Sequence, residues 1–180
     1  MALRPTPRGD AEGKLLEILI TNDDGLGAEG LAVLARAAAP FGRVTVIAPE
    51  AEQSASSHAI SLRTPLRVRR RPDGRIGVSG TPTDCVLLAM NGLVPRPELV
   101  LSGVNHGGNM GDDITYSGTV AAAIEATLIG VPAIAFSVVT RGPHCFESPA
   151  LLIPRIIRRV IESPPRTDPK TFWNVNFPNL

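Results

Sequence analysis

Short apolar runs that alternate with helical patterns constrain the fold of this chain more than any other feature. The first run, at 15–20, is rich in Leu and Ile, and a helical pattern follows it at about 28–39. Runs of this kind are typical of strands that are buried on both faces of a sheet. The alternation predicts an α/β fold, with a mostly parallel sheet and helices on both of its faces.

The remaining elements continue this alternation. The runs at 66–70 and 75–79 are split by Pro72-Asp73-Gly74, which predicts a hairpin with an arginine-rich, solvated outer face. The other expected strands are 43–49, 99–102, 131–137 and 172–175, and the other expected helices are 81–90, 119–129 and 149–162. Loops are expected at 50–58 and 103–118.

Composition limits the number of domains and the classes of partner that the chain can be expected to bind. The chain has 180 residues, of which 43% are apolar and 19% charged, as in a soluble globular domain. A net charge of +1 gives no reason to expect duplex nucleic acid or a membrane as a partner. Cys85 and Cys145 form no Cys-x-x-Cys pair, which indicates reduced thiols and a cytoplasmic protein. We expect residues 1–13 to be a flexible leader and residues 14–180 to be one folded core.

Two adjacent acids, Asp23 and Asp24, lie directly after the first strand. In open α/β sheets, ligands bind beyond the carboxyl ends of the strands, so the loops that begin at residues 22, 50 and 103 should meet at one edge. Neighbouring carboxylates repel one another, and a bound divalent cation would remove that repulsion. The alternative is an Asp that caps the following helix, with a solvated neighbour.

The two long loops add neutral polar groups to the same edge. Residues 53–58 read Gln-Ser-Ala-Ser-Ser-His, and residues 102–113 are rich in Gly, Asn and Asp. Carboxylate, hydroxyl and amide oxygens select magnesium, manganese or calcium over zinc. The three histidines, His58, His106 and His144, are weaker candidates. One of them could serve as an acid near neutrality, but a loop histidine is more often structural or solvated.

A second candidate feature is the start of the helix expected at 119–129. Ser117, Gly118 and Thr119 place hydroxyl groups and free backbone amides at its N-terminus, where phosphate binds well. The alternative is a plain Ser/Thr cap. The glycine-rich segment upstream, and the acid pair expected at the same edge, favour phosphate binding.

A dinucleotide-binding pattern is also present. A Gly-x-Gly-x-x-Gly run at 25–30 follows the first strand, and Glu50 lies 20 residues beyond its last glycine, where such folds place an acid for a ribose hydroxyl. The acid pair argues against it, because unit charges about 4 Å apart repel by roughly 1 kcal/mol even in water. A single phosphate bridged to the acids through a metal fits this turn better than a pyrophosphate.

Five ordered motifs resemble those of the SurE family, the stationary-phase survival proteins, which are metal-dependent 5'- and 3'-nucleotidases. The motifs are Ile-Thr-Asn-Asp-Asp-Gly (20–25), Ala-Pro-Glu (48–50) with Gln53-Ser54, Gly-Thr-Pro-Thr-Asp-Cys-Val (80–86), Ser-Gly-Val-Asn (102–105) with the segment 108–113, and Tyr-Ser-Gly-Thr-Val-Ala-Ala-Ala (116–123). The resemblance covers about residues 15–180.

The resemblance implies a three-layer, Rossmann-like α/β/α fold and phosphomonoesterase activity on nucleoside monophosphates. It also implies a requirement for Mg²⁺ or Mn²⁺ and assembly as a homodimer or homotetramer. Carried over by position, the metal ligands are Asp23, Asp24, Ser54 and Asn105, and the phosphate-binding residues are Asn109, Ser117, Gly118 and Thr119. Asp23 and Asp24 are the catalytic candidates, as a covalent nucleophile or as ligands beside an activated water.

The chain departs from the family pattern in two places. Ala55 stands where many members have glycine after the ligand serine, and we expect it to stiffen that loop while the ligand is kept. Family members usually continue for several tens of residues past the position of Leu180, through a segment that helps to build the oligomer. The alternatives to a nucleotidase are a nicotinamide-dinucleotide oxidoreductase and a non-catalytic module that binds metal or nucleotide.

Overall fold

The computed structural model describes residues 15–140, 142–143, 145–162 and 170–179. The expected leader at 1–13, the proposed domain boundary at residue 14, and His144 lie outside the described residues.

Seven strands within the described residues form one sheet, in the order β3-β4-β2-β1-β5-β6-β7. Neighbouring strands are parallel throughout, except that β3 is antiparallel to β4. The strands are β1 (Leu16–Thr21), β2 (Gly42–Pro49), β3 (Val68–Arg70), β4 (Ile76–Val78), β5 (Leu99–His106), β6 (Ala133–Val139) and β7 (Trp173–Pro178).

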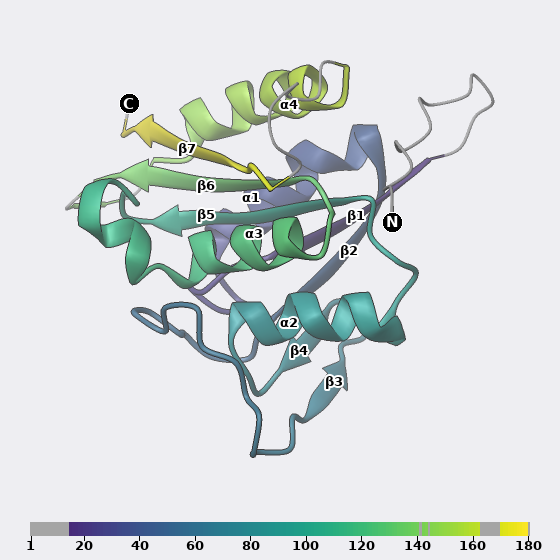
Figure 1. Ribbon diagram of the computed structural model, residues 1–180. Helices are drawn as coiled ribbons and strands as arrows, with labels where there is room; N and C mark the ends of the chain where they lie inside the picture. The colour runs from purple at the N-terminus through teal and green to yellow at the C-terminus, as the bar shows by residue number, and fades with distance from the viewer. Residues whose placement is uncertain (1–14, 141, 144, 163–169, 180) are drawn as a thin grey trace.

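Helices cover both faces of this sheet (Figure 1). They are α1 (Glu29–Ala38), α2 (Pro82–Leu88), α3 (Gly118–Leu128) and α4 (Glu147–Glu162), with short helical turns η1 (Ala39–Phe41), η2 (Ala89–Leu93) and η3 (Gly111–Thr115). Helices α1 and α4 contribute to one apolar cluster, and α2 and α3 contribute to the other, on the opposite face. The predicted three-layer α/β/α fold is therefore confirmed.

The central strand β1 shows why the apolar runs are continuous. Ile18 and Ile20 belong to the cluster with α1, whereas Leu19, between them, belongs to the cluster with α2 and α3. Successive strand side chains point to opposite faces, and both faces here are covered. All three side chains are consequently excluded from water.

The predicted hairpin is present at one edge of the sheet. Val68 in β3 pairs with Val78 in β4, and Gly74 in the turn has φ +85°, a left-handed conformation that favours glycine. Arg69 and Arg70 on β3 are exposed, as predicted for the outer edge.

The strand expected at 99–102 is longer than the sequence indicated. Strand β5 continues to His106, and a register shift between Ser102 and Asn105 allows it to keep its pairing with β6. Val104 is fully buried, so the chain gains apolar contacts by remaining in the sheet. The segment expected as loop at 103–118 therefore begins as strand and also contains η3, and Asn105 lies on a strand rather than on a free loop.

Within the described ranges, no helix combines the length and apolar character that crossing a membrane requires.

Candidate metal and phosphate site

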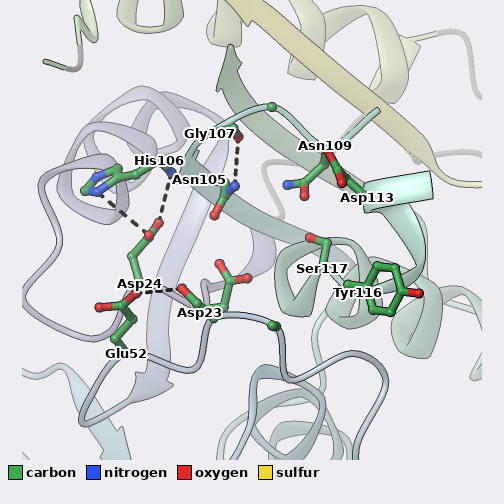
Figure 2. A pocket seen from close by; sticks show the side chains of 13 residues that line it. Asp23, Asp24, Glu52, Asn105, His106, Gly107, Asn109, Asp113, Tyr116 and Ser117 are labelled. Atoms are coloured by element: carbon green, nitrogen blue, oxygen red, sulfur yellow. Dashed lines mark hydrogen bonds and ion pairs between the residues drawn. The ribbon is translucent and has the colours of Figure 1, made fainter. Parts of the chain in front are cut away.

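A cavity of about 440 Å³ opens at the carboxyl edge of the sheet, where the segments after β1, β2 and β5 meet (Figure 2). Of the eight residues predicted for metal or phosphate, it is lined by Asp23, Asp24, Ser54, Asn105, Asn109 and Ser117. The remaining lining residues are Glu52, Ala55, His106, Gly107, Gly108, Asp113 and Tyr116. The parallel sheet thus brings together residues that are far apart in the chain.

Asp23 is held against the N-terminus of α3. The Thr119 hydroxyl donates to Asp23 Oδ1 at 2.5 Å, and the Thr119 backbone N–H donates to Oδ2 at 3.1 Å. Only 4% of Asp23 is exposed. Burial raises the pKa of this carboxyl, and the hydrogen bonds from Thr119 offset part of that rise. A positive charge in the cavity would therefore stabilise the ionised form.

Asp24 is oriented by the end of β5. The His106 backbone N–H donates to Asp24 Oδ2 at 3.2 Å, and His106 Nδ1 lies 3.7 Å from Oδ1. Burial lowers the pKa of His106, whose ring packs at 5.4 Å between centroids against Phe146. Burial thus disfavours the charged form of the ring beside Asp24.

Ser54 and Asn105 have oxygen atoms available for a cation. The Ser54 hydroxyl donates to Glu52 Oε1 at 2.7 Å, so its lone pairs are not needed for that bond. Asn105 Nδ2 donates to the Gly107 carbonyl at 2.8 Å, and Figure 2 shows the amide oxygen turned toward Asp23. The described residues contain no cluster of three or more His, Cys, Asp or Glu side chains that could hold a metal. The set here combines two carboxylates with neutral oxygens, as hard divalent cations accept.

The start of α3 combines a cap with close packing. Ser117 lines the cavity, and its hydroxyl accepts from the Val120 backbone N–H at 3.1 Å, so the alternative prediction of a helix cap is confirmed. A Cβ atom on Gly118 would lie 2.7 Å from Ser56 Oγ and 3.0 Å from Asp23 Cβ. Gly118 and Thr119 do not line the cavity; they pack against Asp23.

Sequence reasoning missed the residues that hold the loop around Asn109. The backbone of Asn109 is hydrogen-bonded by Asn174 and Asn176 of β7, and its side chain contacts Ser137 of β6. The available signal was the Asn-x-Asn spacing, which places two amides on one side of a strand that is otherwise apolar. Glu52, the partner of Ser54, was also missed.

The dinucleotide-like glycine run has a structural explanation. A side chain on Gly30 would collide with the Val104 carbonyl, so this glycine allows α1 to approach β5 closely. Glu50, the acid expected at a ribose, instead faces the hairpin, with Oε1 3.7 Å from Arg69 Nε and 3.6 Å from an Arg71 guanidinium nitrogen. Its charge is already engaged within the protein.

Comparison with known proteins matches nearly all of the folded region to one family. Residues 18–180 match the family described as Survival protein SurE. The chain belongs to the SurE family. It is 52% identical over 167 residues to the 5'-nucleotidase SurE of Pelobacter propionicus, covering 91% of this chain and 66% of the relative. It is 46% identical over 166 residues to the 5'-nucleotidase SurE of Methylococcus capsulatus, covering 92% of this chain and 65% of that relative.

A solved SurE structure gives the same result for the fold. The crystal structure of the SurE protein from Aquifex aeolicus superimposes with a TM-score of 0.83 at 39% identity, covering 91% of this chain and 66% of that chain. This SurE-family chain therefore spans slightly less than two thirds of the length of the relatives it matches.

Proposed function

We propose that this chain is the core of a metal-dependent phosphomonoesterase that hydrolyses nucleoside 5'- or 3'-monophosphates to nucleoside and phosphate. The observation that carries the proposal is the acid pair Asp23-Asp24, which faces the N-terminus of α3 in the same cavity. A cation at the acids, with Ser117 at the positive end of the α3 dipole, is complementary to a phosphate dianion. The relatives named 5'-nucleotidase SurE support nucleotides as the substrate class.

Four residues are proposed to hold the metal: Asp23, Asp24, Ser54 and Asn105. Each has an oxygen atom at or beside the cavity, and none is a soft ligand, which favours Mg²⁺ or Mn²⁺. When bound, such a cation supplies charge that polarises phosphoryl oxygens. Two hydrogen bonds from Thr119 fix the Asp23 carboxyl and offset part of the cost of burying its charge, and the His106 backbone N–H orients Asp24.

Phosphate recognition is assigned to Asn109, Ser117, Gly118 and Thr119, with different roles. The Asn109 side chain contacts the Ser137 hydroxyl at 2.8 Å. Asn109 Nδ2 is the donor in this bond, and an amide NH₂ group has a second hydrogen that can be donated to a phosphate oxygen. Ser117 lines the cavity at the positive end of α3. Gly118 packs against Asp23 and Thr119 donates to it, so these two residues contribute by holding Asp23 in place.

The test is phosphate release from a panel of substrates with Mn²⁺, Mg²⁺ or chelator. The panel contains nucleoside 5'- and 3'-monophosphates, ribose 5-phosphate and a phosphodiester. We expect release from nucleoside monophosphates only when metal is present, and none from the diester. Tight binding of NADH in chelator, without phosphate release from any substrate, would instead support the alternative function of an oxidoreductase.

Oligomeric state and cellular location follow from the same family resemblance and from the cysteine content. We propose a homodimer or homotetramer, supported by the family resemblance, which sedimentation of the purified chain would test. We also propose a cytoplasmic location, supported by a sequence with only two cysteines and no Cys-x-x-Cys pair. Cell fractionation would test the location.

A further inference from the structure

The loop that carries Asn109 is attached to the edge strand β7 by two side-chain amides. Asn176 Oδ1 accepts from the Asn109 backbone N–H at 2.8 Å, and Asn176 Nδ2 donates to the Asn109 carbonyl at 3.1 Å. Asn174 Nδ2 donates to the same carbonyl at 2.9 Å. Both backbone polar groups of Asn109 are therefore bound by residues about 65 positions away in the chain.

These amides continue a polar row that crosses the sheet. In the strand register, Asn105 of β5 is paired with Ser137 of β6, and Ser137 is paired with Asn176 of β7. Paired residues of adjacent strands project from the same face. The row thus runs from a proposed metal ligand to the residue that holds the Asn109 loop, and the Ser137 hydroxyl contacts the Asn109 side chain between them.

Packing of β7 against the core does not require the side-chain amides of Asn174 and Asn176. Val175 and Phe177, at the alternate positions of the strand, pack into the core with α1 and α4. The segment on the other side begins with Gly107 and Gly108, which have no side chains to anchor it, and Met110 is 50% exposed. Hydrogen bonds, rather than apolar burial, therefore fix this segment: β5 and β6 bind Gly107, and β7 binds the backbone of Asn109.

We propose that Asn174 and Asn176 are positioning residues, which set the location of the 107–113 loop and hence of the Asn109 group that meets phosphate. The inference rests on the proposed function in that phosphate is the ligand. Asn176 binds two backbone groups of Asn109, and Asn174 binds one. Loss of Asn176 should therefore have the larger effect.

The variants Asn176→Ala and Asn174→Ala test the proposal, with Asn179→Ala as a matched control. Asn179 lies just beyond β7, and its amide also makes three hydrogen bonds, but to Cys145, Thr140 and Pro143, away from the cavity. We expect KM for a nucleoside monophosphate, and Kd for inorganic phosphate with Mn²⁺, to rise about tenfold in Asn176→Ala and about threefold in Asn174→Ala. Asn179→Ala should stay within about twofold of the parent for both constants.

Two further measurements separate positioning from loss of structure. Affinity for Mn²⁺ alone should be unchanged in all three variants, since the acid pair does not contact β7. Backbone hydrogen exchange in 107–113 should accelerate in Asn176→Ala and not in Asn179→Ala. Unchanged phosphate affinity and exchange in Asn176→Ala, or a parallel loss of metal affinity, would overturn the proposal. If the parent chain releases no phosphate, the proposed function fails, and the exchange result still decides whether β7 holds the loop.

Discussion

Thr119 donates two hydrogen bonds to Asp23, one from its hydroxyl and one from its backbone N–H, across 96 positions of sequence. The contact joins the carboxyl end of β1 to the first turn of α3. It fixes one of the two acids, which is otherwise unfavourably buried, at the base of the cavity. The stability of the fold and the geometry of the proposed metal site therefore depend on the same two hydrogen bonds.

Replacing Thr119 by Val removes the hydroxyl and keeps the shape. We expect the free energy of unfolding to fall by about 2 kcal/mol, because a buried carboxylate loses a charge-assisted hydrogen bond. Affinity for Mn²⁺ should also fall several-fold. Chemical denaturation and calorimetry measure the two effects. Thr127→Val is the control, since Thr127 is buried on the same helix but donates to the Ala123 carbonyl. An equal loss of metal affinity in both variants would refute a specific role for Thr119.

Asp23→Asn should stabilise the chain in chelator near neutral pH. Burial raises the pKa of Asp23 above its ordinary 3.8, so between the two pKa values the folded state holds a proton that the unfolded chain has lost, and above them folding buries a charge. Stability therefore falls as pH rises from 3.8 through the higher folded-state pKa, and the Asn variant lacks that fall. An asparagine can accept from the Thr119 N–H and donate to its hydroxyl, so both contacts survive. Thermal unfolding against pH checks the sign.

The control for this comparison is Asp73→Asn. Hydrogen bonds from Arg75 lower the pKa of Asp73, so its contribution is present above the ordinary pKa and lost as pH falls. This variant should show no gain in Tm at neutral pH. A Tm for Asp23→Asn below that of the parent in chelator would mean that the buried charge is not the source of the penalty.

Gly118→Ala should push Asp23 out of place. The added Cβ would lie 3.0 Å from Asp23 Cβ and 2.7 Å from Ser56 Oγ, closer than side chains tolerate. Overpacking of this kind costs about 1–3 kcal/mol, and we expect Mn²⁺ affinity to fall about tenfold. Gly27→Ala provides the comparison, because a Cβ there meets nothing within 4 Å. Unaltered metal binding in Gly118→Ala would show that the carboxylate tolerates displacement.

Ala55→Gly should stabilise the loop after β2. Ala55 has φ +57°, a left-handed conformation that costs an L-residue about 1–2 kcal/mol. Because glycine also loses more backbone entropy on folding, we expect a net gain of up to about 1 kcal/mol in free energy of unfolding. Ala51→Gly, in the same loop but without positive φ, should have the opposite sign. Denaturant titration of both variants decides this, and a loss in Ala55→Gly would contradict it.

The sequence was sufficient to predict the three layers and the place of the acid pair. Both depend on local signals, namely apolar runs and the rule that ligands gather beyond strand ends. The contact between Asn176 and Asn109 was not predictable in this way, because it needs the strand order β5-β6-β7. Asn105 illustrates the same limit: it was expected in a loop, but the register shift against β6 keeps it in the sheet. The opposite signs expected for Ala55 and Ala51 likewise come from backbone conformation, which residue type alone does not reveal.

Asp23 and Asp24 are proposed to bind the cation on which phosphate release depends. The most direct test is the initial rate of phosphate release from adenosine 5'-monophosphate as free Mn²⁺ is titrated, for the parent chain and Asp24→Asn. We expect no release in chelator, saturation of the parent with metal, and at least a tenfold higher half-saturating Mn²⁺ concentration in the variant, equivalent to about 1.4 kcal/mol. Equal rates with metal and with chelator, or identical metal dependence in both proteins, would contradict the account.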